Sequence, residues 1–320
     1  MAFRRAATAV VGACAMVACV ASAPANADPI PGAAAGAGYR METLAADSFS
    51  SKTIDLKLTY APGFQWYYFN YWSVAPTPSL TTLNSDGSVT LADTAEAMAA
   101  YGTLLSSAGA IKAAPGYRGT AYGGGGYFEA TFAFDATKVN ISQGWPSFWS
   151  MALEHMVGRD QWAGQAPGYE HFIEPDFFEY DMATGVPDYG GEVHDWYGKY
   201  GGQCPPGYCN YNLPYPIQNR PVPSSTNFLQ YHRYGFLWIP ATAVKRGSFT
   251  YYFDGVQTGP VVYYTKFTNQ APTPSAKTPW TFGVIDQQHL VVFIGTNPPV
   301  SMHLKSVQVW QASAMGNVHN

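Results

Sequence analysis

The stretch that decides the fold reads Glu174-Pro175-Asp176-Phe177-Phe178-Glu179. It stands between His171-Phe172-Ile173 and Tyr180, and this apolar and aromatic setting predicts a buried β-strand. Three carboxyl groups in such a strand are costly unless each one is paired or serves a chemical purpose. The run therefore indicates either a functional site or a structural feature, such as an acidic strand edge or a cation site.

The spacing of the acids predicts which face of the strand each one occupies. Glu174 and Asp176 are two residues apart and share a face, whereas Glu179 would point away in a regular strand. One extra residue between Asp176 and Glu179, a β-bulge, would return Glu179 to the shared face, and bulges are common beside active sites. Two glutamates on one face could reach the separation of roughly 5–5.5 Å that a retaining glycosidase needs.

The acidic motif resembles the Glu-x-Asp-x-x-Glu signature of glycoside hydrolase family 16, the laminarinase and lichenase group. Other segments resemble that family in the same order along the chain. They are Gly126-Tyr127-Phe128-Glu129-Ala130, Gly144-Trp145-Pro146-Ser147-Phe148-Trp149, Val193-His194-Asp195-Trp196, Tyr231 to Trp238, Tyr252-Phe253-Asp254-Gly255 and Met302 to Gln311. The resemblance implies an all-β fold, a β-jelly-roll sandwich of two antiparallel sheets as in concanavalin A-like lectins and glucanases.

The same resemblance implies a secreted retaining endo-glycosidase that hydrolyses a β-linked polysaccharide, either a β-glucan or a galactan. Its catalytic residues would be Glu174 as nucleophile, Glu179 as acid and base, and Asp176, which would hold the nucleophile by a shared hydrogen bond. The substrate-binding candidates are Trp145, His194 and Trp196, while Trp149 is expected in the core. A lone histidine is more often a structural hydrogen-bonding residue, and this alternative stays open for His194.

Two features depart from the family pattern. Pro175 stands where the family usually has an aliphatic residue, and because proline gives up a ladder hydrogen bond, we expect the strand to be irregular there. The family's acidic Asp-Glu-Phe segment has no match. The aromatic run from Phe64 to Trp72 takes its place, either as core or as a platform for sugar rings.

Two other classes of protein fit part of the pattern. A non-catalytic carbohydrate-binding protein on the same fold would keep Trp145 and the other aromatics but would not need a spaced acid pair. A secreted structural or adhesive β-protein would bind no sugar. The presence of all three acids favours the enzyme.

The N-terminus predicts export. Residues 1–27 read as a signal peptide, with a charged start at Arg4 and Arg5, an apolar middle and an Ala25-Asn26-Ala27 cleavage site. We therefore expect a secreted protein, extracellular or periplasmic, without a membrane span. The Pro/Ala/Gly-rich segment 28–50 reads as a flexible lead, and 51–313 as a single β-sandwich domain.

Cysteine usage agrees with an oxidising compartment. Cys204 and Cys209 are the two cysteines outside the signal, and there they should close a small disulfide loop. Two thiols are too few for a metal site, so no metal ligands and no cofactor are predicted. The resembled fold allows a structural calcium ion, although the sequence shows no ligand cluster for one.

The composition narrows the class of partner. Charged residues make up 12% of the chain, the formal net charge is −4, and there is no basic patch, so nucleic acid is not an expected partner. The chain holds 23 Tyr, 18 Phe and 9 Trp, whose rings can cover the apolar faces of sugars. An ordinary aromatic β-core explains most of this excess. We expect a monomer that binds a polysaccharide substrate.

Overall fold

A computed structural model describes residues 29–71, 75–94, 102–110, 116–158, 167–180, 188–199, 209–213, 219–242, 244–264 and 285–320. The chain divides into the units Met1–Ile30 and Pro31–Asn320, and the fold is that of the second unit. The predicted signal peptide, residues 1–27, lies outside the described residues, as does Cys204, so export and the disulfide stay predictions. Among the described helices, none is long and apolar enough to cross a membrane.

Regular structure in the described residues is almost entirely strand. The helices are α1 Gly32–Gly36, η1 Pro78–Leu80, η2 Ala136–Lys138, α2 Leu153–Met156, η4 Ile285–Gln287 and η5 Ala314–Gly316. The strands are β1 Met41–Ala46, β2 Tyr67–Tyr68, β3 Thr81–Leu83, β4 Val89–Leu91, β5 Leu105–Ser106, β6 Ala108–Ala110, β7 Tyr117–Ala121, β8 Gly126–Phe134, β9 Ser147–Ala152, β10 Glu170–Glu179, β11 Asp188–Gly198, β12 Cys209–Leu213, β13 Asn219–Pro221, β14 His232–Ile239, β15 Gly247–Phe253, β16 Val256–Tyr264, β17 Leu290–Gly295, β18 Met302–Gln311 and β19 Val318–His319.

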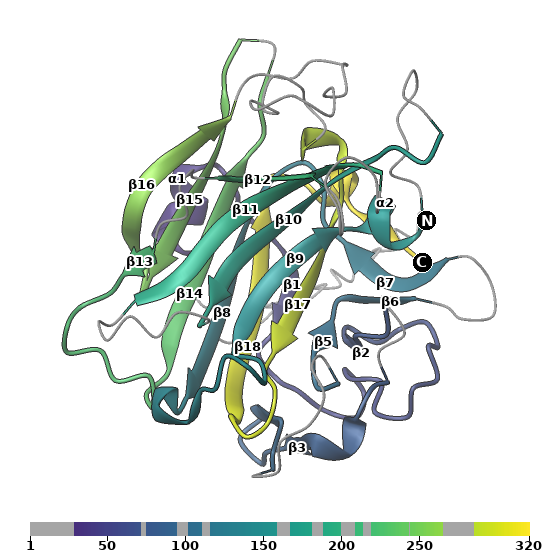
Figure 1. The fold of residues 1–320 in the computed structure, drawn as a ribbon, viewed down its shortest axis with the longest axis vertical. Coiled ribbons are helices and arrows are strands. Elements are labelled where there is room, and N and C mark those ends of the chain that lie inside the picture. The colour runs from purple at the N-terminus through teal and green to yellow at the C-terminus, as the bar shows by residue number, and fades with distance from the viewer. Residues whose placement is uncertain are drawn as a thin grey trace, which may run out of the picture. The chain divides into compact units, whose positions relative to one another are not determined.

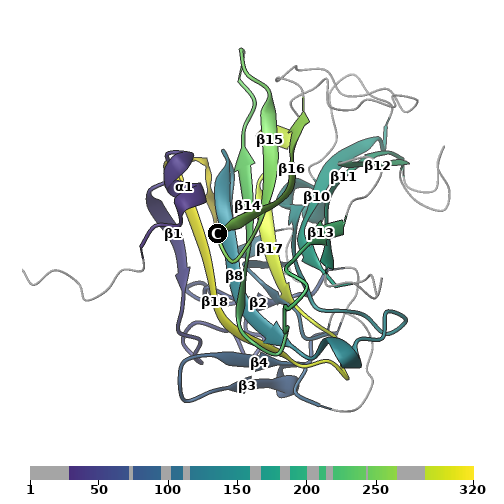
Figure 2. The same cartoon turned by 90° about the vertical axis from the view of Figure 1, so that its left-hand side faces the viewer.

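The strands form two large sheets that face each other (Figures 1 and 2). One eight-stranded sheet has the order β16-β15-β14-β8-β18-β4-β3, with β1 on β18, and the other has the order β12-β11-β10-β9-β17-β5-β2, with β13 on β11. Neighbouring strands in both sheets are antiparallel. The predicted all-β jelly-roll sandwich of two antiparallel sheets is confirmed.

Aromatic side chains from facing strands fill the space between the sheets. The alternation in β8 sends Phe128 and Phe132 inward, where they meet Phe177 and Phe178 of β10 at ring-centroid distances of 5.2 and 5.0 Å. All four rings are fully buried. Burial of apolar surface stabilises by roughly 25 cal/mol per Å², so each ring contributes on the order of a few kcal/mol. This packing holds β10 against the opposite sheet, and it thereby sets the positions of the acidic residues on β10.

Regular structure extends beyond both ends of the segment predicted as the sandwich domain. Within the lead predicted at 28–50, α1 forms a helix and β1 pairs with β18, its Met41 opposite Gln311. Regular structure also continues past residue 313, because β19 pairs with β7 in a separate three-stranded sheet, β19-β7-β6, and the Gly119 N–H donates to the carbonyl of Asn320. In both cases the reason is a partner far away in the sequence, which the local Ala, Gly and Pro content does not reveal.

The described part of the aromatic run belongs to the core. Trp66, Tyr67, Tyr68 and Phe69 are all fully buried. Phe69 packs against Trp149 at 6.2 Å between ring centroids, within a second apolar cluster beside the main core. Of the two interpretations left open for this run, the core holds for these four residues, and Trp149 is buried as expected.

Candidate active site

A β-bulge in β10 brings the three acids of the motif to one face. Glu174 pairs with His194 of β11 and Asp176 with Glu192, but the register then shifts, and Glu179 pairs with Gly190. Because residues 190, 192 and 194 alternate along β11 and share a face, their three partners on β10 share it as well. The predicted bulge between Asp176 and Glu179 is confirmed.

The two residues inside the bulge explain the shift. Phe177 and Phe178 are consecutive, yet both are fully buried against the opposite sheet, Phe177 on Phe236 at 4.4 Å and Phe178 on Tyr234 at 4.4 Å. A regular strand would turn one of them outward, so the extra residue satisfies both rings at once. The acids point away from the opposite sheet. We call this outer surface, which carries Glu174, Asp176, Glu179, Glu192 and His194, the acidic face.

The structure also accommodates Pro175 within the strand. Pro175 pairs with Val193 of β11, while the backbone pairing of β10 with β9 begins only at Asp176. The hydroxyl of Ser150 on β9 donates to the Pro175 carbonyl at 3.2 Å, which gives that buried oxygen a partner where the ladder does not reach. The register with β11 thus stays regular through Pro175, and only the ladder on the β9 side is missing there.

Glu174 receives a hydrogen bond from one of the predicted sugar-binding residues. The indole N–H of Trp196 donates to its Oε2 at 2.7 Å, and the Trp196 ring stacks on Phe172. Burial raises the pKa of Glu174, while the charge of His194 and the indole hydrogen bond act in the opposite direction. Glu174 stays partly exposed on the acidic face.

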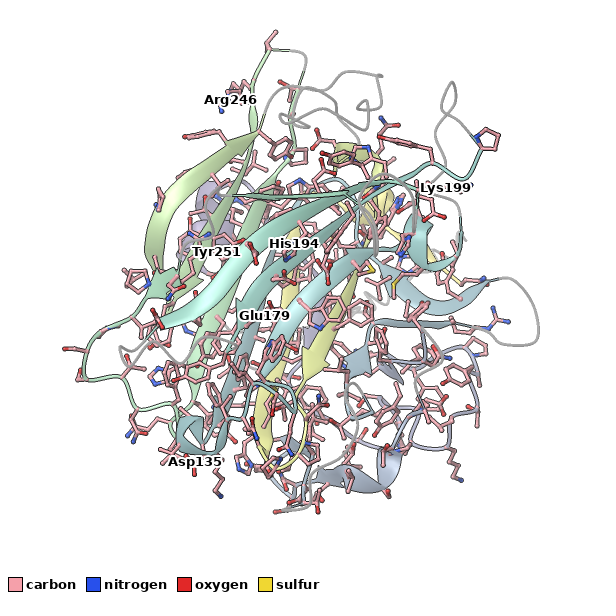
Figure 3. All side chains as sticks on the ribbon, viewed as in Figure 1. Asp135, Glu179, His194, Lys199, Arg246 and Tyr251 are labelled. Atoms are coloured by element: carbon pink, nitrogen blue, oxygen red, sulfur yellow. The ribbon has the colours of Figure 1, made fainter. Side chains whose placement is uncertain are left out.

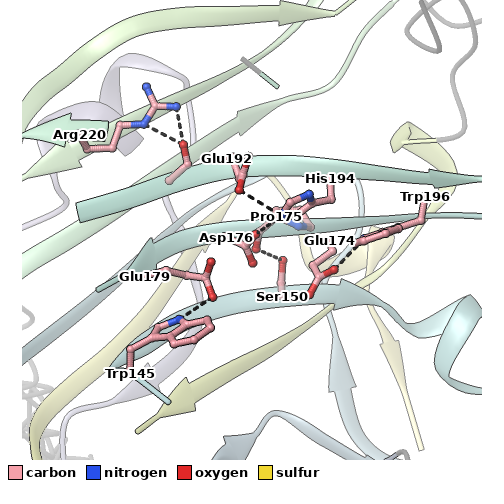
Figure 4. A network of polar contacts seen from close by, with 11 residues as sticks. Trp145, Ser150, Glu174, Pro175, Asp176, Glu179, Glu192, His194, Trp196 and Arg220 are labelled. Atoms are coloured by element: carbon pink, nitrogen blue, oxygen red, sulfur yellow. Dashed lines mark hydrogen bonds and ion pairs between the residues drawn. The ribbon is translucent and has the colours of Figure 1, made fainter. Parts of the chain in front are cut away.

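Glu179 is held in the same manner at the other end of the motif. The indole N–H of Trp145 donates to its Oε1 at 3.0 Å, and both side chains are partly exposed. Figure 4 shows the two indoles reaching the two glutamates from opposite ends of the acidic face. The structure thus gives Trp145 and Trp196, both predicted only as substrate-binding residues, a contact with the glutamates that the sequence did not suggest.

Asp176 contacts a different partner from the expected one. Its Oδ2 lies 3.1 Å from His194 Nε2, and the same nitrogen lies 3.2 Å from Glu192 Oε1. The expected hydrogen bond between Asp176 and Glu174 is therefore replaced by the pair with His194. Burial raises the pKa of Asp176. Burial opposes the charge on His194, but its contacts with Asp176 and Glu192 outweigh burial and raise the pKa of the imidazole.

Sequence reasoning missed two residues of this network. Glu192 follows two glycines, which reads as a turn, but β11 carries it onto the acidic face opposite Asp176. Arg220 of β13 is fully buried behind the sheet, where its Nε and Nη2 donate to the Gly191 carbonyl at 2.9 and 2.6 Å (Figure 4). Its guanidinium lies over the ring of Tyr251. Only the pairing of β11 with β10 and β13 could have identified either one.

The site residues thus gather on the sheet of β9, β10 and β11, where Figure 3 labels Glu179 and His194. Glu174, Asp176 and Glu179 come from β10, while His194 and Trp196 come from β11 and Trp145 precedes β9. The side chain of Cys209 is not described, so it adds nothing to the predicted disulfide. Three groups, Asp176, Glu192 and His194, are close enough to hold a metal ion, although no metal ligands were predicted.

Comparisons with known proteins give distant likenesses. No known family model matches the sequence, and no curated protein matches it. Among solved structures, the κ-carrageenase from Pseudoalteromonas carrageenovora, in complex with an oligotetrasaccharide of κ-carrageenan, is 14% identical over 73% of this chain and 83% of its own, with a TM-score of 0.42. The endo-1,3-β-glucanase from Streptomyces sioyaensis is 16% identical over 76% and 80%, with a TM-score of 0.43.

An alginate lyase of polysaccharide lyase family 7 is also similar, at 8% identity over 83% of this chain and 98% of its own, with a TM-score of 0.34. At such identities and scores, these likenesses assign neither a family nor a substrate to this chain. The functional conclusion therefore depends on the acidic face itself.

Proposed function

We propose that the protein is a retaining glycoside hydrolase that cleaves a β-linked polysaccharide, with Glu174 as nucleophile and Glu179 as acid and base. One observation carries the proposal: the bulge in β10 brings both glutamates to one face, and an indole N–H fixes one oxygen of each. Retaining glycosidases need two carboxyl groups close together that flank the scissile bond, one to attack the anomeric carbon and one to protonate the leaving oxygen. The resemblance of the motif to glycoside hydrolase family 16 supports the same assignment.

In the first step, Glu174 attacks the anomeric carbon while Glu179 protonates the departing glycosidic oxygen. Trp196 holds Oε2 of Glu174, so Oε1 is the oxygen that forms the bond. A nucleophilic carboxylate must be ionised, and the Trp196 N–H and the His194 charge favour the ionised form against the effect of burial. These two residues therefore keep a partly buried glutamate reactive.

In the second step, a water molecule attacks the anomeric carbon and displaces the Glu174 carboxylate. Glu179, now ionised, removes a proton from the water, and the bond between Glu174 and the sugar breaks. Trp145 donates to Glu179 Oε1 and holds the carboxyl group in position for this step. Asp176 and His194 form an ion pair between the two glutamates, and in this proposal the pair positions Glu174 without reacting.

The test is an activity screen combined with two matched variants. Laminarin, lichenan, agarose and carrageenan are incubated with the wild type, Glu174→Gln and Glu179→Gln, and new reducing ends are measured. We expect release from at least one polysaccharide and a loss of about 10³-fold or more in each variant. Glu154→Gln is the control, because Glu154 also pairs with a histidine, His289, but lies outside the acidic face.

The other outcomes of this screen identify the alternatives. Binding of a polysaccharide by the wild type without release of reducing ends indicates the non-catalytic carbohydrate-binding protein. Absence of both binding and release indicates a structural or adhesive protein. Wild-type rates in Glu174→Gln or Glu179→Gln contradict the assigned roles.

The proposed substrate also fits the predicted export. A polysaccharide is too large to enter a cell intact, so an enzyme that hydrolyses it acts outside the cytoplasm. The predicted signal peptide at 1–27 would deliver the chain there. We expect a β-glucan or a galactan, since the acidic face carries four carboxyl groups and one imidazole and does not favour an anionic chain.

A further inference from the structure

Three side chains on the acidic face converge in a manner that the hydrolysis does not explain. Asp176 comes from β10, and Glu192 and His194 come from the adjacent β11. One oxygen or nitrogen of each residue lies within 4.8 Å of the other two. The His194 Nε2 is central, at 3.1 Å from Asp176 Oδ2 and 3.2 Å from Glu192 Oε1 (Figure 4).

These distances suit a shared metal ion better than a shared hydrogen. A single N–H points along one line, so it cannot align with both carboxylates, and a charge-assisted N–H···O bond is usually about 2.7–2.9 Å long. Around an ion with bonds of about 2.0–2.2 Å, neighbouring ligand atoms in tetrahedral or octahedral geometry lie roughly 2.9–3.6 Å apart. Both contacts of His194 fall within that range.

A second observation is independent of these distances. The other oxygen of Glu192, Oε2, is buried and has no hydrogen-bond partner among the residues that the structure describes, and Glu192 is only 8% exposed. A buried carboxylate oxygen without a donor costs free energy, so it calls for a partner that these residues do not supply. A cation held between Glu192, Asp176 and His194 would supply it.

We propose that Asp176, Glu192 and His194 form a binding site for a divalent transition-metal ion, with Zn²⁺ as the best fit, and that the bound ion inhibits hydrolysis. Zn²⁺ accepts both imidazole nitrogen and carboxylate oxygen as ligands, whereas Ca²⁺ takes oxygen ligands. The inhibition rests on the proposed function. An ion on Asp176 places positive charge two residues from Glu174 and lowers the nucleophilicity of its carboxylate. It also replaces the contact between Asp176 and His194 that positions Glu174.

Metal binding is tested directly, without any substrate. The mature chain is treated with EDTA, dialysed and titrated with ZnCl₂ by isothermal titration calorimetry, and we expect one ion per chain. Glu192→Gln and His194→Gln should each weaken binding at least ~10-fold. Glu154→Gln is the matched control, because its Glu154–His289 pair has the same chemistry with a single carboxylate, and it should bind as the wild type does.

X-ray absorption of the zinc-loaded wild type protects the test against a variant that fails to fold. We expect one imidazole nitrogen and at least two carboxylate oxygens around the ion. No binding at 1 mM ZnCl₂, unchanged binding in Glu192→Gln, or a shell with two imidazoles or a sulfur overturns the site.

Inhibition is measured separately, on a polysaccharide that the wild type cleaves, as the ratio of rates with and without ZnCl₂. In the wild type this ratio should be ~0.1 or less, and it should return to about one when EDTA is added. In Glu192→Gln it should stay near one. Zinc bound without any change in rate overturns the inhibition and leaves hydrolysis standing. Zinc bound by a chain that cleaves no polysaccharide overturns the proposed function and leaves the metal site standing.

Discussion

Trp196→Phe is the substitution that most sharply tests how Glu174 is kept reactive. The indole N–H of Trp196 donates to Glu174 Oε2 at 2.7 Å, and phenylalanine keeps most of the ring while removing this donor. The hydrogen bond favours the ionised carboxylate, so its loss raises the pKa of Glu174. Since attack needs the ionised form, activity falls as the pH drops through that pKa, and the acid limb of the profile should move to higher pH.

The size of the shift follows from the hydrogen bond. A bond to a charged group contributes about 1.5–3 kcal/mol. Glu174 is partly exposed, so water replaces part of the lost bond, and we expect about 1.4 kcal/mol, which is about one pH unit.

The assay is kcat/KM against pH, which reports the free enzyme, in buffers that contain EDTA so that no metal ion occupies the acidic face. Trp145→Phe serves as the matched variant, because its indole contacts Glu179 and not Glu174. It should lower kcat and leave the acid limb in place. A folded Trp196→Phe protein whose acid limb stays at the wild-type pH, or moves to lower pH, refutes the reasoning.

The remaining predictions concern the bulge and the core. Deletion of Phe178 removes the extra residue of β10, turns Glu179 or the aromatic residues to the wrong face, and should abolish release of reducing ends; a folded deletion variant with wild-type activity would show that the bulge is unnecessary. Phe177→Ala leaves a cavity between the sheets and should lower the free energy of unfolding by about 3–5 kcal/mol in urea titration, whereas a loss under 1 kcal/mol would contradict the packing. Gly119 has φ +111°, and an added Cβ would lie 2.2 Å from the Ser107 carbonyl oxygen, so Gly119→Ala should lower Tm by several degrees in calorimetry, and an unchanged Tm would be inconsistent with this backbone.

Individual strands and the bulge could be predicted from neighbouring residues, whereas the sandwich was implied by the resemblance of segments spread along the chain. The alternation of aromatic and other residues in Gly126–Phe134 predicts a strand with an aromatic inner face. The five-residue separation of Glu174 and Glu179 requires an extra residue if both acids are to share a face. The prediction for these elements therefore needed no knowledge of the remaining chain.

The missed features depend on which strands meet. β1 reads as a flexible lead until it pairs with β18, more than 250 residues later. Glu192 reads as part of a turn until β11 brings it opposite Asp176, and the partner of Asp176 could not be known before that register was known. Arg220 belongs to a strand of three residues, too short to give any periodic signal.

The most direct measurement of the central claim is the location of the covalent intermediate. Glu179→Gln lacks the base for the second step, so with an aryl β-glycoside that carries a good leaving group it should accumulate the glycosyl-enzyme. Peptide mapping by mass spectrometry should find one added sugar residue, attached to Glu174. A sugar attached to any other residue, or hydrolysis by the wild type that inverts the anomeric configuration, would contradict the account.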